Sequence, residues 1–116
     1  FDELSDERKG EKSDHIRKRV INARKLQSLR FKDITGIHYN AQLTPSLIEK
    51  YCKIDKNGKL LIKTAMNKLG FSARSYSRIL KVSRTIADLD RCNKIKATHI
   101  AEAIGFRSLD RDGWLG

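Results

Sequence analysis

Two consecutive amphipathic helices, separated by a glycine, constrain the fold of this chain more than any other feature of its sequence. Residues 58–69 place apolar side chains at helical spacing, and Gly70 stands where a left-handed C-cap would end that helix. Ser72 can then cap a second amphipathic helix, which runs to Leu89. No alternation of apolar and polar residues is sustained along the chain, so these signals predict an all-α fold.

Two shorter helices follow from the same kind of signal. Thr44 and Pro45 combine a capping hydroxyl with proline at the first helical position, so we expect a short helix that ends near Cys52. A last helix is expected to bury Ile100, Ala103 and Ile104 and to end at Gly105. Turns are predicted at residues 55–58 and 90–94.

A long basic helix is predicted to precede this bundle, with Ser13 as its N-cap. No acidic residue occurs between His15 and Lys32. Its thin apolar stripe consists of Ile16, Val20, Ala23 and Gln27, and its candidate contacts to DNA or to an acidic partner domain are Arg17, Arg19, Arg24 and Lys25. A solvated basic surface is the alternative. The loop at residues 31–43 is expected to be held by Phe31, Ile34, Ile37 and Tyr39.

The charge is distributed unevenly. The net charge is +11, but residues 1–14 hold six acids and three bases, so the rest of the chain carries +14. A body this basic favours polyanionic partners, and residues 1–12 are predicted to be a linker or flexible tail. Cys52 and Cys92 lack the spacing of a metal site or disulfide framework, and no apolar run is long enough to span a membrane. We therefore expect a cytoplasmic protein that has no metal site and no membrane partner.

The helix from Ser72 contains the residues best suited to bind phosphate. Arg74 lies in its first turn, where free N–H groups and the helix dipole favour anions, and Arg78 and Lys81 lie within about 40° of it at 100° per residue. The opposite, buried face is predicted to hold Ile79, Val82, Ile86 and Leu89. Arg84 and Asp88 are expected to pair on the surface.

Complete catalytic sets are absent from the sequence. There is no glycine-rich phosphate loop, and His15, His38 and His99 are scattered, so a structural or surface role is expected for each. No serine stands in a nucleophile elbow. We therefore do not expect the isolated chain to be an enzyme. Because it opens on Phe1 without an initiator methionine, we expect it to be a piece of a longer protein.

The stretch from Phe71 to Leu89 closely resembles the C-terminal domain of magnesium-chelatase-like AAA+ ATPases, especially their bacterial competence-protein branch. The residues that carry this resemblance are Ala73-Arg74, Arg78-Ile79-Leu80 and Arg84-Thr85-Ile86-Ala87-Asp88-Leu89. Residues 11–20, with Ala23, Arg24 and Gln27, resemble the family's segment after the nucleotide-binding core. Residues 99–104 and 107–111 resemble its closing helix and tail. Ser83 departs from the alanine that is usual in the family.

The resemblance implies that this chain is the helical lid of an ATPase. Residues 13–43 would lead out of the AAA+ core, and residues 44–116 would form the lid. Arg74 would be the sensor-2 arginine that reaches the γ-phosphate of ATP, with Arg78 as a weaker candidate. ATP and Mg²⁺ would then be cofactors of the full-length protein, its partners would be the upstream core and neighbouring subunits of a ring, and its work would be DNA processing. The alternatives are a basic helical DNA-binding module and a free-standing helical adaptor, neither with nucleotide chemistry.

Overall fold

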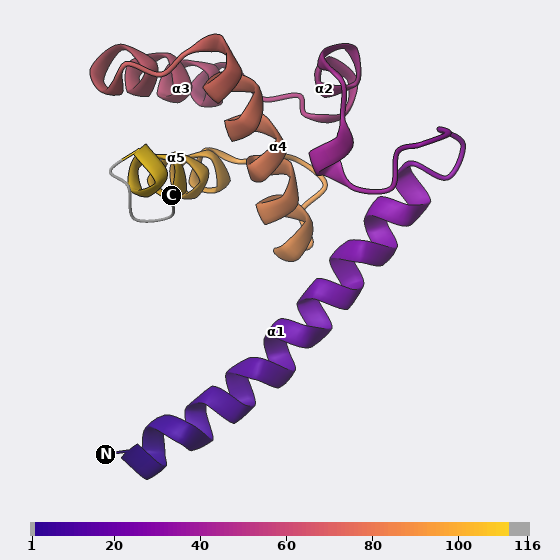
Figure 1. Ribbon diagram of the computed structural model, residues 1–116, viewed down its shortest axis with the longest axis vertical. Helices are drawn as coiled ribbons and strands as arrows, with labels where there is room; N and C mark the ends of the chain where they lie inside the picture. Colours follow the sequence, from indigo (N-terminus) through magenta and orange to yellow (C-terminus); the bar gives the residue numbers. More distant parts are fainter. Residues whose placement is uncertain (1, 112–116) are drawn as a thin grey trace.

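The chain forms one long helix followed by a bundle of shorter helices (Figure 1). The computed structural model describes the backbone of residues 2–111 and the side chains of residues 13–106. Its elements are α1 (Asp2–Arg30), the 3-10 turn η1 (Asn40–Gln42), α2 (Pro45–Tyr51), α3 (Lys56–Leu69), α4 (Ala73–Leu89) and α5 (Ala97–Arg111). Residues 2–111 contain no strand, so the predicted all-α class is confirmed. None of the described helices is long and apolar enough to cross a membrane.

The helix boundaries with the strongest capping chemistry lie where the sequence predicts them. Gly70 ends α3 in the left-handed conformation, with φ 68° and ψ 35°. The hydroxyl of Ser72 accepts the N–H of Ser75 at 3.3 Å and caps α4. Thr44 precedes α2 and Pro45 is the first residue of that helix, although the Thr44 side chain makes no capping hydrogen bond.

Three boundaries differ from the prediction. α1 begins at Asp2, so Ser13 lies inside the helix and is not its N-cap. The predicted turn at residues 55–58 is wrong, because Asp55 accepts the N–H of Gly58 at 2.8 Å and caps α3. α5 continues through Gly105 to Arg111. The assignment of residues 1–12 to a linker stays a prediction, since their side chains lie outside the described residues.

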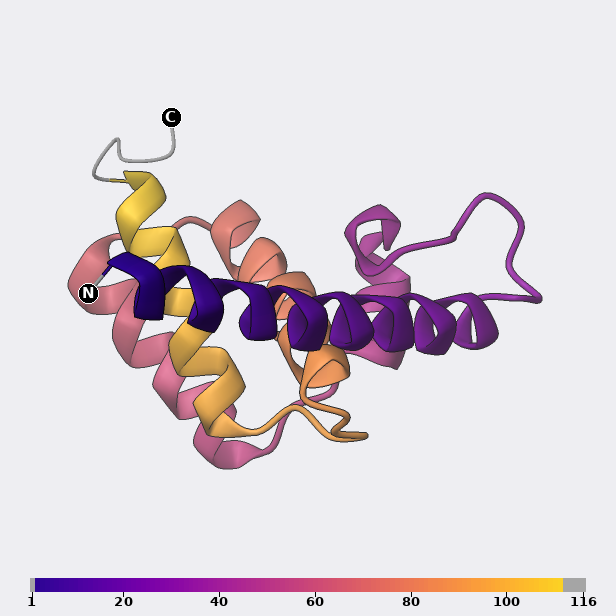
Figure 2. The ribbon, with the colours of Figure 1, turned by 90° about the horizontal axis from the view of Figure 1, so that it is seen from below.

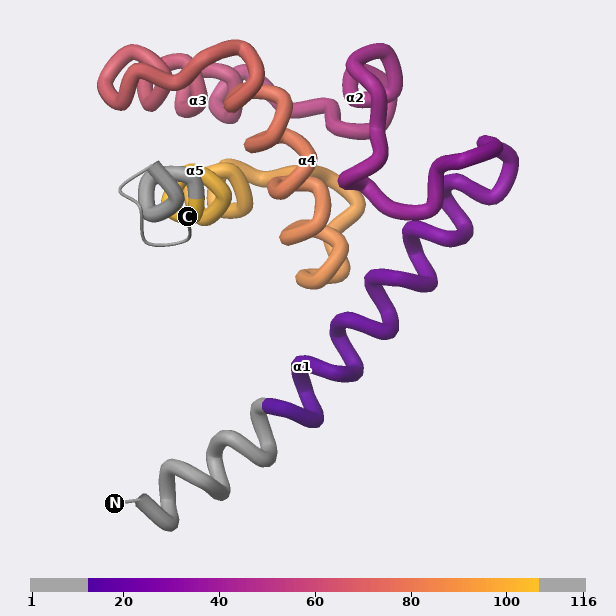
Figure 3. Tube along the Cα trace, in the orientation of Figure 1, coloured from indigo at the N-terminus to yellow at the C-terminus, as the bar shows by residue number. Residues whose placement is uncertain are grey.

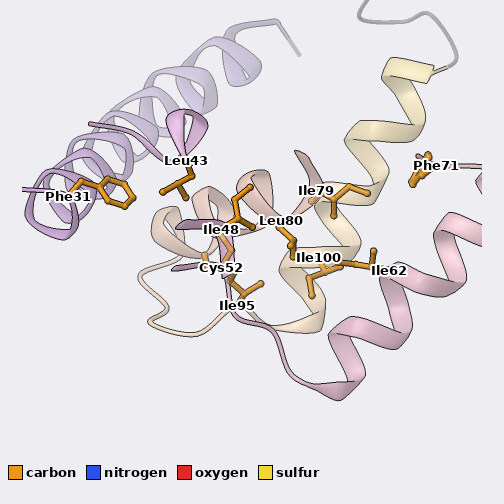
Figure 4. Packing of buried hydrophobic residues seen from close by; sticks show 12 residues of the cluster. Phe31, Leu43, Ile48, Cys52, Ile62, Phe71, Ile79, Leu80, Ile95 and Ile100 are labelled. Atoms are coloured by element: carbon orange, nitrogen blue, oxygen red, sulfur yellow. The ribbon is translucent and has the colours of Figure 1, made fainter. Parts of the chain in front are cut away.

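The core of the bundle lies between α3, α4 and α5 (Figure 4). Ile62, Ile79 and Ile100 come from these helices in turn, and each is at most 1% exposed. Cys52 closes the side of the core near α2, where burial raises the pKa of its thiol to about 11. At neutral pH the Cys52 thiol is therefore protonated, and the side chain packs in the core as a small apolar group.

Gly58 allows α3 and α5 to approach closely. A Cβ added at this buried position would lie 2.6 Å from Cδ1 of Ile100, which is itself fully buried and has little room to move. We expect Gly58→Ala to lower the free energy of unfolding by about 1–3 kcal/mol, despite the better helix propensity of alanine. Urea denaturation of the chain measures this.

Gly105→Ala is the matched control, because a Cβ there meets nothing within 4 Å. Replacement of this second helical glycine should raise the free energy of unfolding by roughly 0.5–1 kcal/mol. Equal stabilisation of the chain by both substitutions would contradict the close approach of the two helices.

The loop between α1 and α2 is held against the bundle at several points. Phe31 is buried, and Ile34 and Ile37 are partly buried against the core, as predicted. Tyr39, by contrast, is 53% exposed and does not anchor the loop. Asn40 does so instead: it is 1% exposed, and its backbone N–H donates to Oε1 of Gln27 at 3.0 Å.

α1 passes the C-terminal end of α4 and contacts it (Figures 2 and 3). Ala23 and Gln27 of the predicted stripe are buried, but Ile16 is 53% exposed and does not pack against the bundle. Nε of Arg19 donates to the backbone oxygen of Leu89 at 3.2 Å. This docking places a long basic surface beside α4.

Candidate anion-binding surface

The first turn of α4 presents Arg74 to solvent. The side chain is exposed, and it has no hydrogen-bond or ion-pair partner among residues 13–106. Arg78 lies one turn further along, is also exposed, and makes no such bond within the same residues. Lys81 is half-buried, and its Nζ donates to the backbone oxygen of Ala41 at 3.2 Å. Two of the three cations in the predicted row are therefore available to a ligand.

These three cations line a groove along α4, with a volume of about 660 Å³. We call it the α4 groove; its lining residues are Ala41, Arg74, Ser77, Arg78, Lys81, Val82, Thr85, Ile86, Leu89 and Phe106. Val82 and Ile86 are half-buried against the core, as predicted, and they also line the groove, whereas Leu89 is not part of the core cluster and its predicted place there is wrong. The buried side of α4 is formed by Ile79 and Leu80 together with the small residues Ser75, Ser83 and Ala87. The α4 groove is thus both cationic and apolar.

The basic side chains of α1 separate into two groups. Arg19 bonds to the end of α4, so it contributes to docking. Arg17, Arg24 and Lys25 are exposed on the helix, and the last two flank a shallow hollow that also involves Ile21 and Leu29. The candidate residues on α1 therefore form a surface distinct from the α4 groove.

The largest departure from the sequence prediction is a buried cluster of charges around Asp88. Arg84 and Asp88 were expected to pair on the surface, but they are 5% and 1% exposed. Asp88 also receives Arg30 of α1: Nη2 donates to Oδ1 at 2.6 Å and Nη1 to Oδ2 at 2.9 Å. Asn40 donates to Oδ2 at 2.9 Å. We call Arg30, Asn40, Arg84 and Asp88 the Asp88 cluster.

Arg84 connects this cluster to the turn after α4. Its Nη1 donates to the backbone oxygen of Asn93 at 2.9 Å, and its Nη2 donates to that of Cys92 at 2.7 Å. Burial lowers the pKa of the Arg84 guanidinium, and the negative charge of Asp88 opposes this shift. Two cations thus share one carboxylate, and the cluster carries net positive charge.

A second polar group ties the turn after α4 to α5. Side-chain atoms of Asp90, Cys92 and His99 lie within 4.8 Å of one another, a distance that a metal could bridge. However, Nδ1 of His99 accepts the N–H of Lys96 at 2.9 Å, so a neutral ring carries its proton on Nε2 and points it at Asp90, 3.0 Å away. The hydrogen bond from His99 lowers the pKa of the Asp90 carboxyl. This geometry fits a helix cap, and it gives His99 a structural role.

Arg30 and Asn40 are neighbours of α4 that the sequence patterns do not predict. Their partners lie 58 and 48 residues away, so no local pattern connects them. One available signal was the run of small residues on α4, which marks the face that approaches other elements most closely. Another was Asp88 itself, the single acid in a helix with four basic residues.

Comparison with known proteins identifies relatives along most of the chain. Residues 10–107 match the family described as magnesium chelatase, subunit ChlI C-terminal. The competence protein ComM of Haemophilus influenzae is 43% identical over 103 residues, which are 89% of this chain and 19% of that protein. The uncharacterized protein YifB of Salmonella typhimurium is 38% identical over the same shares of the two chains. The chain thus spans about a fifth of the length of these relatives.

Proposed function

Because the chain belongs to the family of the magnesium chelatase ChlI C-terminal domain, we propose that it is the helical lid of an AAA+ ATPase in which Arg74 senses the γ-phosphate of ATP. The observation that carries the proposal is the state of Arg74. It lies in the first turn of α4, is exposed, and has no partner among residues 13–106. Arg84, by comparison, is buried and donates from both terminal nitrogens to backbone oxygens of the bundle.

The residues of the α4 groove fit a phosphate group. A guanidinium remains charged at any relevant pH and offers a planar fork of donors to phosphate oxygens. The residues that line the groove include no carboxylate, the side-chain group that usually holds Mg²⁺. The remainder of the full-length protein would hold the metal and the rest of ATP, and bound nucleotide would supply the phosphoryl group that is transferred.

In this proposal Arg74 couples nucleotide state to lid position. Arg74 binds the γ-phosphate before hydrolysis and loses that contact when phosphate leaves. An ion contact that exists in only one nucleotide state shifts the equilibrium between two lid positions. ATP hydrolysis by the full-length protein with Arg74→Ala tests the proposal, and the isolated chain should bind ATP weakly or not at all.

The wider setting also belongs to the proposal. The partners would be the AAA+ core of the same protein and neighbouring subunits of a ring. The substrate would be DNA, which is consistent with the basic body of the chain and with a relative named as a competence protein.

A second candidate function, a basic DNA-binding module, rests on the exposed face of α1 with Arg17, Arg24 and Lys25. If this face binds DNA backbone, the logarithm of the binding constant should fall with the logarithm of salt concentration, by about 0.9 per phosphate contacted in duplex DNA. Titration of duplex and single-stranded DNA at two salt concentrations measures this. The double variant Arg24→Glu with Lys25→Glu should weaken binding and reduce the slope by the amount expected for about two lost phosphate contacts.

Lys59→Glu with Lys63→Glu is the charge-matched control, since both lysines are exposed on α3. This control should leave most of the slope in place. Equal losses from the two double variants would show non-specific attraction to a basic protein, and no binding at low salt would exclude the surface.

A further inference from the structure

We propose that the Asp88 cluster fixes α1 to α4, so that the C-terminal half of α1 and the α2–α5 bundle move as one rigid body. Arg30 and Asp88 are then positioning residues: they set the direction of α1 relative to the α4 groove. The consequence for lid movement rests on the proposed function, whereas the rigid body itself does not.

The geometry of Arg30 is the first argument. Its two terminal nitrogens donate to different oxygens of Asp88, at 2.6 and 2.9 Å. A bidentate pair of this kind restricts both distance and angle, which a single lysine contact would not do. Because Asp88 is 1% exposed and Arg30 contributes 19% of its side chain to the surface, the pair is largely shielded from screening by salt.

Asn40 gives the cluster a third point of attachment. Its side-chain oxygen accepts from Arg30 at 3.1 Å, while its nitrogen donates to Asp88 and, at 3.0 Å, to the hydroxyl of Thr85. The backbone N–H of the same residue donates to Gln27 of α1. The loop after α1 is thus bonded to α1 and α4 at once, and a rotation within the loop would break several buried bonds.

Apolar packing contributes little to this docking. Within residues 13–30, Ala23 is the one buried apolar side chain, and Val20 and Leu26 are half-buried. Ile21 and Leu29 are 47% and 66% exposed and face away from the bundle. The polar contacts of the Asp88 cluster are therefore the main connection between α1 and α4.

The rigid attachment of α1 to α4 determines where the hinge of the proposed lid would lie. Residues 31–43 separate the predicted basic helix from the predicted lid, and the sequence predicts that this loop is held against the body. Phe31, Asn40 and Leu43 are all buried, so the loop belongs to the rigid body. Rotation of the lid would then occur on the N-terminal side of Arg19, the first described residue of α1 that bonds to α4.

Residual dipolar couplings of backbone amides test the inference in the whole chain, without nucleotide. In the unmodified protein, amides of residues 19–30 and of α3–α5 should fit a single alignment tensor. Arg30→Met keeps the length of the side chain and removes the fork, so the couplings of α1 should fall by roughly half while those of α3–α5 stay unchanged. Arg30→Lys, which keeps the charge alone, should give an intermediate loss.

Arg24→Met is the matched control, because Arg24 is exposed on the same helix and lies outside the cluster. It should leave every coupling unchanged. The inference is overturned if α1 retains its couplings in Arg30→Met, or if the signals of α3–α5 are lost together with those of α1. The couplings do not depend on Arg74 or on ATP. The rigid-body inference can therefore be wrong while the proposed function is right, and the proposed function can be wrong while the rigid-body inference is right.

Discussion

Replacement of Arg74 by alanine in the full-length protein is expected to abolish measurable ATP hydrolysis, with a loss of turnover of roughly 10²–10³-fold. The physical reason is that the guanidinium stabilises negative charge on the γ-phosphoryl group where water is excluded. Folding should be unaffected, because the side chain is exposed and unpaired among residues 13–106. Steady-state phosphate release at saturating ATP measures turnover, and thermal unfolding verifies the fold.

Arg78→Ala is the control for Arg74→Ala. Arg78 is exposed on the same face of α4, about 6 Å further along the helix axis. Its substitution therefore removes the same charge from the α4 groove as Arg74→Ala does. Its loss should reduce turnover far less if the position in the first turn is what matters. Near-normal hydrolysis by the Arg74 variant would exclude the sensor role, and equal losses from both variants would point to general attraction of nucleotide.

Asp88→Asn is expected to lower the free energy of unfolding of the chain by about 3–5 kcal/mol, the largest stability effect that we predict for a single substitution. The change is isosteric, so it leaves the packing intact and removes the one negative charge between Arg30 and Arg84. Two partly or fully buried cations would then face each other without a counter-ion. Urea denaturation at neutral pH measures the effect.

Glu102→Gln serves as the reference for the loss of one carboxylate, because Glu102 is exposed on α5. Its effect should stay within about 0.5 kcal/mol. A change of similar size in Asp88→Asn would mean that water or a rearranged arginine compensates the missing charge, and would remove the basis for the Asp88 cluster as a structural centre.

Capping chemistry made much of the fold predictable from sequence. Gly70 and Ser72 determine the end of α3 and the start of α4 through bonds within a few residues, so a local pattern is sufficient. Glycine is an ambiguous signal, however. Gly105 continues a helix, and Gly58 lies inside one because α5 needs the space of its missing side chain.

Side-chain burial on α4 was harder to predict, because a helix in contact with several elements has no single apolar face. Leu89 lines the α4 groove and is not part of the core cluster, whereas Ser83 and Asp88 are buried. Hydrophobicity misassigns these three residues, since the Ser83 hydroxyl donates to the backbone oxygen of Ile79 at 2.7 Å and Asp88 binds Arg84 of the same helix and Arg30 of a distant segment. The grouping of Arg74, Arg78 and Lys81 followed from helical spacing, and the phosphate-sensing role of Arg74 stays a prediction.

The span of the Asp88 cluster also orders events during synthesis on the ribosome. Arg30 is translated 58 residues before Asp88, which corresponds to about 3–12 s of elongation at ordinary rates. During that interval Arg30 has no carboxylate of Asp88 to bind. The described surface of α1 is basic and only weakly apolar, so the undocked helix exposes little hydrophobic area that could cause aggregation. Among the described helices, α1 is thus translated before the others but can dock only after the end of α4 has been made.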